Sequence, residues 1–316
     1  MTLAVALLVG GLVLLTFSAD RLVVSAVALS RKSGLSPILI GAVVVGLGTS
    51  APELSVSISA ALDNDLGLAV GNVVGSNIAN VTLVIGAAAL VSPLRSQVLV
   101  LRREGVLMFF AVALLGWFLY DQELVRIEGL VLLVGLVVAL WLLVRWARDG
   151  HVDESIAEPQ LEELEGEERP TWFHIVAGLV SLGLTLLGAE LLVTGASDLA
   201  VQLGMSSTLI GLLLVAVGTS LPELATALAS ARRRESDLVI GNIVGSNLFN
   251  SLAVAGSAAV VGPAALDSDL LIPAVLAMVG VSAIAGVFSL TGGRVVRWEG
   301  LILLLAFATY AVLISV

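Results

Sequence analysis

Residues 48–80, GTSAPELSVSISAALDNDLGLAVGNVVGSNIAN, recur 170 residues later at 218–250 as GTSLPELATALASARRRESDLVIGNIVGSNLFN. The two copies align without a gap from residues 41–81 to residues 211–251, and 17 of these 41 positions are identical. The identities concentrate on Gly, Thr, Ser, Pro, Glu and Asn rather than on the abundant Leu, Val and Ala. Because composition alone would match the abundant residues, a repeat carried by rare polar ones indicates internal duplication.

The composition predicts an all-α integral membrane protein. The chain is 58% hydrophobic and 13% charged, with a mean hydropathy of +1.08, outside the range of ordinary soluble domains. Apolar runs of about 20 residues, enough to cross a bilayer core, follow one another along the chain. They predict ten transmembrane helices at about residues 3–29, 36–61, 67–91, 104–120, 126–146, 172–198, 206–230, 238–262, 269–290 and 298–315.

The last five predicted helices repeat the first five, so we divide the chain into three parts. Residues 1–147 form the first five-helix repeat, 148–171 an acidic linker, and 172–316 the second repeat. The linker carries most of the chain's net charge of −10, and we interpret it as a solvated connection. A weak cation-gathering surface is the alternative. The first twenty residues lack a basic segment and a clear cleavage site, which predicts a retained helix rather than a signal peptide.

The basic residues predict the topology. Those in loops after the first, third, fifth, seventh and ninth helices are Arg31, Lys32, Arg95, Arg102, Arg103, Arg145, Arg148, Arg169, Arg232, Arg233, Arg234, Arg294 and Arg297. Loops on the other side hold only Arg126. The positive-inside rule places the former loops and the linker in the cytoplasm, with both termini outside the cell membrane. Five helices per repeat is an odd number, so the second repeat is predicted to be inverted.

Each copy of the motif places a glutamate, Glu53 or Glu223, within an apolar stretch. A charge at the middle of a bilayer costs at least about 2.5 kcal/mol, and such residues mark ion pathways. A proline precedes each glutamate and removes a backbone hydrogen bond, which predicts a broken helix with carbonyl oxygens beside the carboxylate. Thr49 and Ser50 precede Glu53 by four and three residues, so helical spacing predicts that both lie on its face.

The second half of the motif adds further oxygen ligands. Ser76 and Asn80 lie one helical turn apart, as do Ser246 and Asn250, while the motif glycines have the small-xxx-small spacing of closely packed helices. Carboxylates, hydroxyls, amides and carbonyls together suit hard cations such as Ca²⁺ and Na⁺. The chain has no cysteine, and its two histidines lie outside the motifs, which argues against a soft-metal site.

The duplicated GTSxPE and GNxxGSN motifs resemble those of the sodium/calcium exchanger family of calcium/cation antiporters. The resemblance implies four central ion sites, opened alternately by sliding of the first and sixth helices, in a chain that functions as a monomer. The ligands that it implies are Glu53, Glu223, Thr49 and Thr219 for Ca²⁺; Ser50, Ser220, Ser76, Ser246 and the carbonyls of Gly46 and Ala216 for Na⁺; and Asn80 and Asn250 between the halves.

One position departs from the family pattern. Exchangers of this family commonly have an aspartate where this chain has Asn250, so the site has two carboxylates instead of three. Two glutamates balance one Ca²⁺ but compensate three Na⁺ less well. Closely spaced, desolvated carboxylates also tend to hold a proton, so coupling to H⁺ stays open.

The sequence therefore predicts a secondary antiporter that exports Ca²⁺ in exchange for Na⁺ across the lipid bilayer. It predicts no cofactor, no nucleic-acid partner and no enzymatic activity. Ca²⁺/H⁺ exchange is the nearest alternative, and a passive cation channel is an alternative from a different class. A hydrolase using Glu53 and Glu223 as acid and base finds no support, because no His-Glu metal motif or Gly-x-Ser-x-Gly elbow is present.

Charges in the first and sixth predicted helices are less informative. Asp20 and Arg21 lie toward the inner part of the first helix, and Glu190 matches Asp20 in the sixth. We interpret them as mutually paired or snorkelling side chains near the interface. A gating or proton-sensing pair is the alternative.

Overall fold

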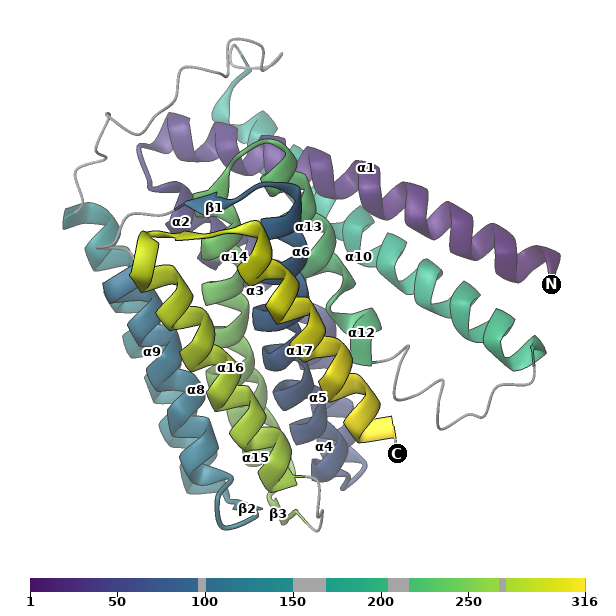
Figure 1. The fold of residues 1–316 in the computed structure, drawn as a ribbon, viewed down its shortest axis with the longest axis vertical. Helices are drawn as coiled ribbons and strands as arrows, with labels where there is room; N and C mark the ends of the chain where they lie inside the picture. Colours follow the sequence, from purple (N-terminus) through teal and green to yellow (C-terminus); the bar gives the residue numbers. More distant parts are fainter. Residues whose placement is uncertain (96–100, 150–168, 204–215, 267–270, 316) are drawn as a thin grey trace.

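The computed structural model describes residues 1–95, 101–149, 169–203, 216–266 and 271–315. Helices dominate these residues (Figure 1). They are α1 (Thr2–Ser33), α2 (Pro37–Ile40), η1 (Gly41–Gly46), α3 (Leu47–Thr49), α4 (Ala51–Leu62), α5 (Leu66–Ala79), η2 (Asn80–Val84), α6 (Ile85–Val91), η3 (Leu101–Gly105), α8 (Val106–Phe118), α9 (Arg126–Asp149), α10 (Thr171–Gln202), α12 (Ala216–Thr219), α13 (Leu221–Arg232), α14 (Ser236–Leu248), η6 (Phe249–Val254), α15 (Ala255–Val261), α16 (Leu271–Gly292) and α17 (Arg297–Ser315). The η segments are π-helical.

The all-α prediction is confirmed. Helical segments occur in each of the ten predicted ranges, although 206–215 of the seventh range lie outside the described residues. Five of the described helical spans are long and apolar enough to cross a membrane alone, and a sixth is obtained if the bent pair Pro37–Thr49 and Ala51–Leu62 counts as one span. The full count of ten membrane crossings stays a prediction. Most of the linker, 150–168, also lies outside the described residues.

Local sequence signals set several helix ends. α1 ends where Gly34 adopts a left-handed conformation with φ of 68°, which glycine accepts without steric cost. The Ser36 hydroxyl accepts a hydrogen bond from the Leu39 amide at the start of α2, and the Asp65 carboxylate accepts one from the Leu68 amide at the start of α5. Both are N-caps that satisfy amides left free at a helix start.

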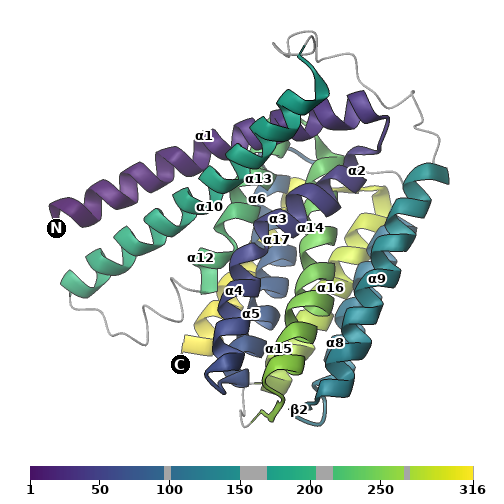
Figure 2. The same ribbon diagram turned by 180° about the vertical axis from the view of Figure 1, so that it is seen from behind.

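α1 and α10 form an antiparallel pair that lies obliquely across the remaining helices (Figures 1 and 2). Glycines bring the two backbones together. A Cβ added at Gly11, Gly188 or Gly195 would lie 2.4–2.6 Å from a backbone atom of the other helix. The Thr185 hydroxyl also donates to the Ser18 hydroxyl across the pair, at 3.0 Å. Small residues thus allow α1 and α10 to pack closely along their length.

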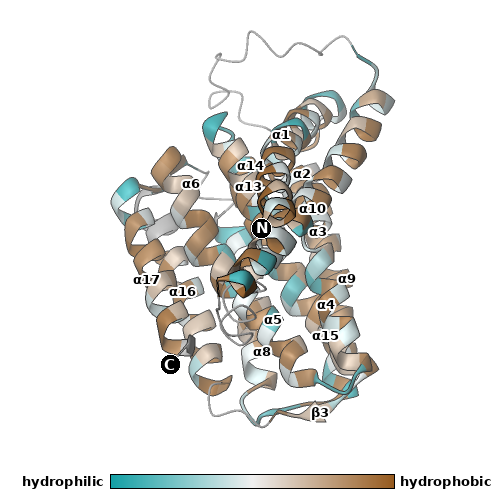
Figure 3. Cartoon of the chain, turned by 90° about the vertical axis from the view of Figure 1, so that its right-hand side faces the viewer, coloured by the Kyte–Doolittle hydropathy of each residue, from teal (hydrophilic) through white to brown (hydrophobic). Residues whose placement is uncertain are grey.

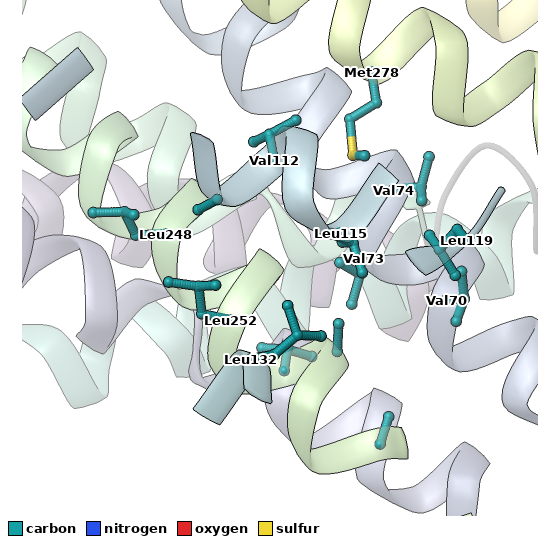
Figure 4. Close-up of a cluster of buried hydrophobic side chains, with 14 of the residues drawn as sticks. Val70, Val73, Val74, Val112, Leu115, Leu119, Leu132, Leu248, Leu252 and Met278 are labelled. Atoms are coloured by element: carbon teal, nitrogen blue, oxygen red, sulfur yellow. The ribbon is translucent and has the colours of Figure 1, made fainter. Parts of the chain in front are cut away.

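The centre of the bundle consists of two continuous helices that each contain a π-helical segment, α5–η2–α6 and α14–η6–α15. They are mostly buried, whereas α1, α9 and α10 are mostly exposed. A large apolar cluster packs on one side of them, and Figure 4 shows Leu115, Leu119, Leu132, Leu252 and Met278 within it. Many large apolar side chains of the outer helices are instead exposed, and the hydropathy colouring of Figure 3 shows that these helices are largely hydrophobic. Apolar exposure on this scale is expected of helices that face lipid.

Two short strand pairs join the two halves of the chain. β1 (Leu94–Arg95) pairs antiparallel with β4 (Arg294–Val295), and β2 (Glu123–Leu124) pairs antiparallel with β3 (Ala264–Ala265). β1 and β3 occupy equivalent positions in the repeat, 170 residues apart, yet they lie at opposite ends of the bundle (Figure 1). Equivalent loops of the two copies therefore do not share one end of the molecule.

An ion pair ties α1 to the end of α13. The Arg233 guanidinium donates from Nε to Oδ1 of Asp20 at 2.8 Å and from Nη2 to Oδ2 at 2.7 Å. This bidentate geometry is the one in which arginine binds a carboxylate most strongly. The mutual pairing expected among these charges is not what the structure gives Asp20, whose partner is Arg233 from the second half of the chain instead of the neighbouring Arg21.

Candidate functional site

The glutamate-bearing helix is interrupted in both copies of the motif, as predicted. α3 ends at Thr49 and α4 begins at Ala51, with a bend of 43° between the two helical pieces. α12 and α13 are interrupted in the same way at Ser220. Proline occupies the first turn of each new helix, where its missing amide costs no hydrogen bond.

This interruption places Glu53 and Glu223 in the first turns of α4 and α13. The free amides at a helix start favour a nearby negative charge, so the local fold supports a carboxylate at each position. Both side chains have no exposed surface, and they are close enough to interact electrostatically. Two buried carboxylates that repel each other are costly unless a cation or a proton neutralises them.

The hydroxyls before each proline lie near the glutamate of the other half, but the two copies differ in hydrogen bonding. Ser50 Oγ donates to Glu223 Oε1 at 2.8 Å, and Thr49 also lies beside Glu223. Thr219 lies beside Glu53, outside hydrogen-bond geometry. That Thr49 and Ser50 share the face of Glu53 stays a prediction, because the hydrogen bond that the structure gives Ser50 goes to Glu223. The helix is interrupted at Ser50, so the regular helical spacing does not continue from these hydroxyls to Glu53.

The Gly46 carbonyl joins the same set of groups. It accepts hydrogen bonds from Ser246 Oγ at 3.2 Å and from Thr49 Oγ1 at 3.3 Å, and Ser246 Oγ lies 3.4 Å from Glu223 Oε1. α14 reaches this carbonyl because its motif glycines fit tightly against the first half. A Cβ on Gly245 would lie 2.1 Å from the carbonyl oxygen of Ala42. The predicted close helix packing is confirmed at this crossing.

Four buried asparagines lie where the central helices become π-helical. Asn80 begins η2 and donates from Nδ2 to Asn247 Oδ1 at 3.0 Å, and Asn250 lies in η6. Asn77 Nδ2 donates to the Ser251 hydroxyl at 3.0 Å. π-helical turns inside α-helices occur frequently at functional sites. Asn77 and Asn247 were absent from our sequence-based set, although both are repeated within the GNxxGSN motif.

Several oxygen atoms of the predicted set are buried without a hydrogen-bond partner among the described residues. They are both carboxylate oxygens of Glu53, Oε2 of Glu223, the hydroxyls of Ser76, Thr219 and Ser220, and the amide oxygens of Asn80 and Asn250. Buried polar atoms normally have a partner, so such a group of oxygens fits hard cations, which bind through oxygen. Ala216, the remaining member, is the first residue of α12.

The site is not a conventional metal centre. The described residues contain no group of three or more His, Cys, Asp or Glu side chains that could hold a metal ion. A cation here depends on two carboxylates supplemented by neutral hydroxyl, amide and carbonyl oxygens. Weak ligands of this kind suit an ion that must leave again. Membrane helices around such a set define a membrane cation transporter.

The comparisons with known proteins agree with this class. The family model for "Sodium/calcium exchanger protein" matches residues 3–145 and 173–316. The putative antiporter CaxA of Alkalimonas amylolytica is 42% identical over 311 residues, covering 96% of both chains, and the sodium/calcium exchanger MaX1 of Methanosarcina acetivorans is 32% identical, also covering 96% of both. The chain belongs to the sodium/calcium exchanger family.

Two further relatives extend the comparison. The inner membrane protein YrbG of Escherichia coli strain K12 is 42% identical over 262 residues, covering 81% of this chain and 79% of that protein. A solved structure of the sodium-calcium exchanger NCX_Mj, soaked with 10 mM Na⁺ and 10 mM Sr²⁺, superposes with a TM-score of 0.84 at 28% identity. The superposition covers 98% of this chain and 97% of that one.

Proposed function

We propose that this chain is a secondary antiporter that exports Ca²⁺ from the cytoplasm in exchange for Na⁺. The observation that carries the proposal is the fully buried pair Glu53 and Glu223, of whose four carboxylate oxygens three have no protein partner among the described residues. Membership of the sodium/calcium exchanger family supports the same ions. The transported ions are substrates, and the proposal includes no cofactor.

In this proposal the two glutamates, each from one half, bind a single Ca²⁺ with the help of Thr49 and Thr219. Two carboxylates neutralise its charge, and the threonines supply neutral oxygens. Na⁺ binds at the flanking ligands, which are the hydroxyls of Ser50, Ser220, Ser76 and Ser246 and the carbonyls of Gly46 and Ala216. Asn80 and Asn250 lie between the halves. The two ligand sets adjoin each other, and exchange is obligatory in this proposal because an empty site does not switch between the two access states.

The arrangement in the membrane follows the sequence-based topology. Residues 1–147 and 172–316 form two inverted five-helix repeats in the cell membrane, and 148–171 lies in the cytoplasm between them. Both termini lie outside. The placement of β1 and β3 at opposite ends of the bundle supports the inversion, since these strands occupy equivalent positions in the two repeats (Figure 1).

The α1–α10 pair is the element that we propose moves between the two access states. It packs closely through glycines and lies across the remaining helices, so it can slide as one unit (Figure 2). At present it is held to the end of α13 by the Asp20–Arg233 ion pair. A cation between Glu53 and Glu223 relieves their repulsion, so a loaded site permits the switch and an unloaded one opposes it.

Ca²⁺/H⁺ exchange is the second candidate, and one observation favours it. Asn250 is an amide in a position where the resembling exchangers commonly have an aspartate, so fewer negative charges balance several Na⁺ ions. The two facing glutamates could instead release Ca²⁺ by taking up protons.

Uptake of ⁴⁵Ca²⁺ into proteoliposomes with Na⁺, K⁺ or H⁺ as the only counter-ion tests the proposal. We expect uptake when the vesicles are loaded with Na⁺ and only background when they are loaded with K⁺. Uptake driven by a pH gradient alone would select Ca²⁺/H⁺ exchange. Uptake that needs no counter-ion at all would identify a channel and overturn antiport.

A further inference from the structure

Two asparagines outside the predicted ligand set contact the glutamate-bearing helices in the same way. Asn72 Nδ2, on α5, donates to the backbone carbonyl of Glu53 at 3.1 Å. Asn242 Nδ2, on α14, lies 3.4 Å from the backbone carbonyl of Glu223 and donates to it. Asn72 and Asn242 are equivalent positions of the repeat, being the first asparagine of each GNxxGSN motif. The hydrogen bonds that the described residues give these two amide groups go to carbonyls and hydroxyls.

Each amide also bonds a hydroxyl about one turn further along the same helix. Asn72 Nδ2 donates to Ser57 Oγ at 2.9 Å, and Asn242 Nδ2 donates to Thr226 Oγ1 at 3.1 Å. The amide therefore spans two successive turns of α4 or α13. This contact fixes both the rotation and the axial position of that helix against its neighbour, and thereby the direction in which the glutamate side chain points.

Both copies of the repeat provide a hydroxyl partner for the asparagine, but from different positions. The first copy reads Val56-Ser57, whereas the second reads Thr226-Ala227, so the hydroxyl has moved by one position between the copies. Residues three and four positions from a glutamate lie on the same helix face, so both arrangements place the hydroxyl within reach of the asparagine. Within this one chain, the contact has persisted while the residue that makes it has moved.

We propose that Asn72 and Asn242 are positioning residues that hold the Glu53 and Glu223 backbones at the ion site. The inference rests on the proposed function. Asn242 has a further contact, because its Oδ1 lies 3.4 Å from Thr49 Oγ1 of the other half. It thus connects a ligand-bearing segment of each half. An aspartate could not replace it, since a carboxylate cannot donate to the glutamate carbonyl.

The test measures the apparent Ca²⁺ affinity and the maximal transport rate of the full chain in proteoliposomes, with ⁴⁵Ca²⁺ as the probe. Groups that orient metal ligands typically change affinity by about 10–100-fold when removed. We expect Asn72→Ala and Asn242→Ala to raise the half-saturating Ca²⁺ concentration by about that factor. In the absence of Ca²⁺, the thermal unfolding temperatures of both variants should be close to that of the wild-type protein.

A pair of substitutions at one position separates positioning from general packing. Thr226→Val removes the hydroxyl at nearly constant volume, whereas Thr226→Ser keeps it. We expect only the valine variant to lose Ca²⁺ affinity, and we expect the same contrast for Ser57→Ala and Ser57→Thr. Thr309→Val is the control, since Thr309 is exposed on α17 and its hydroxyl donates to the Leu305 carbonyl of the same helix. These variants also give a result if the asparagine variants fail to fold.

The outcomes are distinct. A half-saturating concentration within about twofold of wild type in both asparagine variants would overturn the inference, as would equal losses in Thr226→Val and Thr226→Ser. Antiport by the wild-type protein would be unaffected by either result. Failure of the wild-type protein itself to bind or move Ca²⁺ would instead overturn the proposed function, and the inference with it.

Discussion

The two copies of the motif are alike in sequence but differ in their contacts. Glu223 accepts a hydrogen bond from Ser50 and lies within reach of Ser246, whereas neither oxygen of Glu53 has a partner among the described residues. The ends of the bundle differ too. Asp20 binds Arg233, whereas the residues at the equivalent positions of the repeat, Glu190 for Asp20 and Asp63 for Arg233, are both acidic and cannot form the same ion pair. The alternating-access mechanism proposed above needs such a difference between the halves. In that proposal, exchanging the two arrangements opens the site to the other side.

The largest expected effect comes from removing either carboxylate. We predict that Glu53→Gln and Glu223→Gln each reduce ⁴⁵Ca²⁺ transport at least about 100-fold, because one remaining charge cannot balance a divalent ion in a buried site. Transport assays in proteoliposomes measure this. The two losses should be similar, since both glutamates serve one ion. Wild-type transport rates in either variant would show that the substituted glutamate is not part of the ion site.

A glycine substitution tests the crossing that brings the halves together. Gly245→Ala places a Cβ 2.1 Å from the Ala42 carbonyl, so α14 must move away from η1. Overpacking of this kind costs about 1–3 kcal/mol, and we expect a lower thermal unfolding temperature together with weaker Ca²⁺ binding. Gly280→Ala is the matched control, because an added Cβ there meets no described atom within 4 Å. Equal behaviour of the two variants would contradict the tight crossing.

A smaller effect should distinguish the two serines before the prolines. Ser50→Ala removes the hydrogen bond to Glu223, whereas Ser220 makes no described hydrogen bond through its hydroxyl. A bond to a charged group contributes about 1.5–3 kcal/mol, so we expect Ser50→Ala to change ion affinity more than Ser220→Ala. Titration of Ca²⁺ and Na⁺ in each variant measures the difference. The reverse order would mean that the conformation described here is not the one that binds.

The smallest effect concerns the ion pair at the end of the bundle. Asp20 and Arg233 are partly exposed, with 41% and 28% of their side-chain surfaces accessible, so their pairing contributes at most about 1 kcal/mol. We expect Asp20→Asn to shift the balance of access states by up to about fivefold. Because the chain has no cysteine, labelling of a single introduced cysteine can report that balance. Asp63→Arg should give Glu190 an ion-pair partner and so favour the access state in which Asp20 and Arg233 are apart. Unchanged labelling in both variants would contradict a role of these ion pairs in holding either access state.

Much of the fold could be predicted from the sequence because membrane helices are encoded locally. Apolar runs located the helical segments, and the prolines located the interruptions that place Glu53 and Glu223 in first turns. The hydrogen bond from Ser50 of the first half to Glu223 of the second half could not be predicted, since it depends on how the two halves pack against each other. The π-helical segments beside Asn80 and Asn250 were missed for a similar reason, because their sequences read as ordinary apolar helix.

Asn72 and Asn242 show where closer reading of the sequence would have helped. Both are repeated polar residues in otherwise apolar stretches, which is the same pattern that identified the glutamates. Their contacts go to backbone carbonyls of Glu53 and Glu223, however, and no spacing rule predicts a side chain that acts on another helix's backbone.

The central claim is that Glu53 and Glu223 are two halves of one site, and Ca²⁺ binding stoichiometry tests it most directly. Equilibrium titration of the purified chain with Ca²⁺ in Na⁺-free buffer should give one high-affinity Ca²⁺ per chain. Either Glu53→Gln or Glu223→Gln should abolish that binding, and added Na⁺ should compete with it. Two Ca²⁺ ions per chain, with one retained in each single variant, would contradict a shared site.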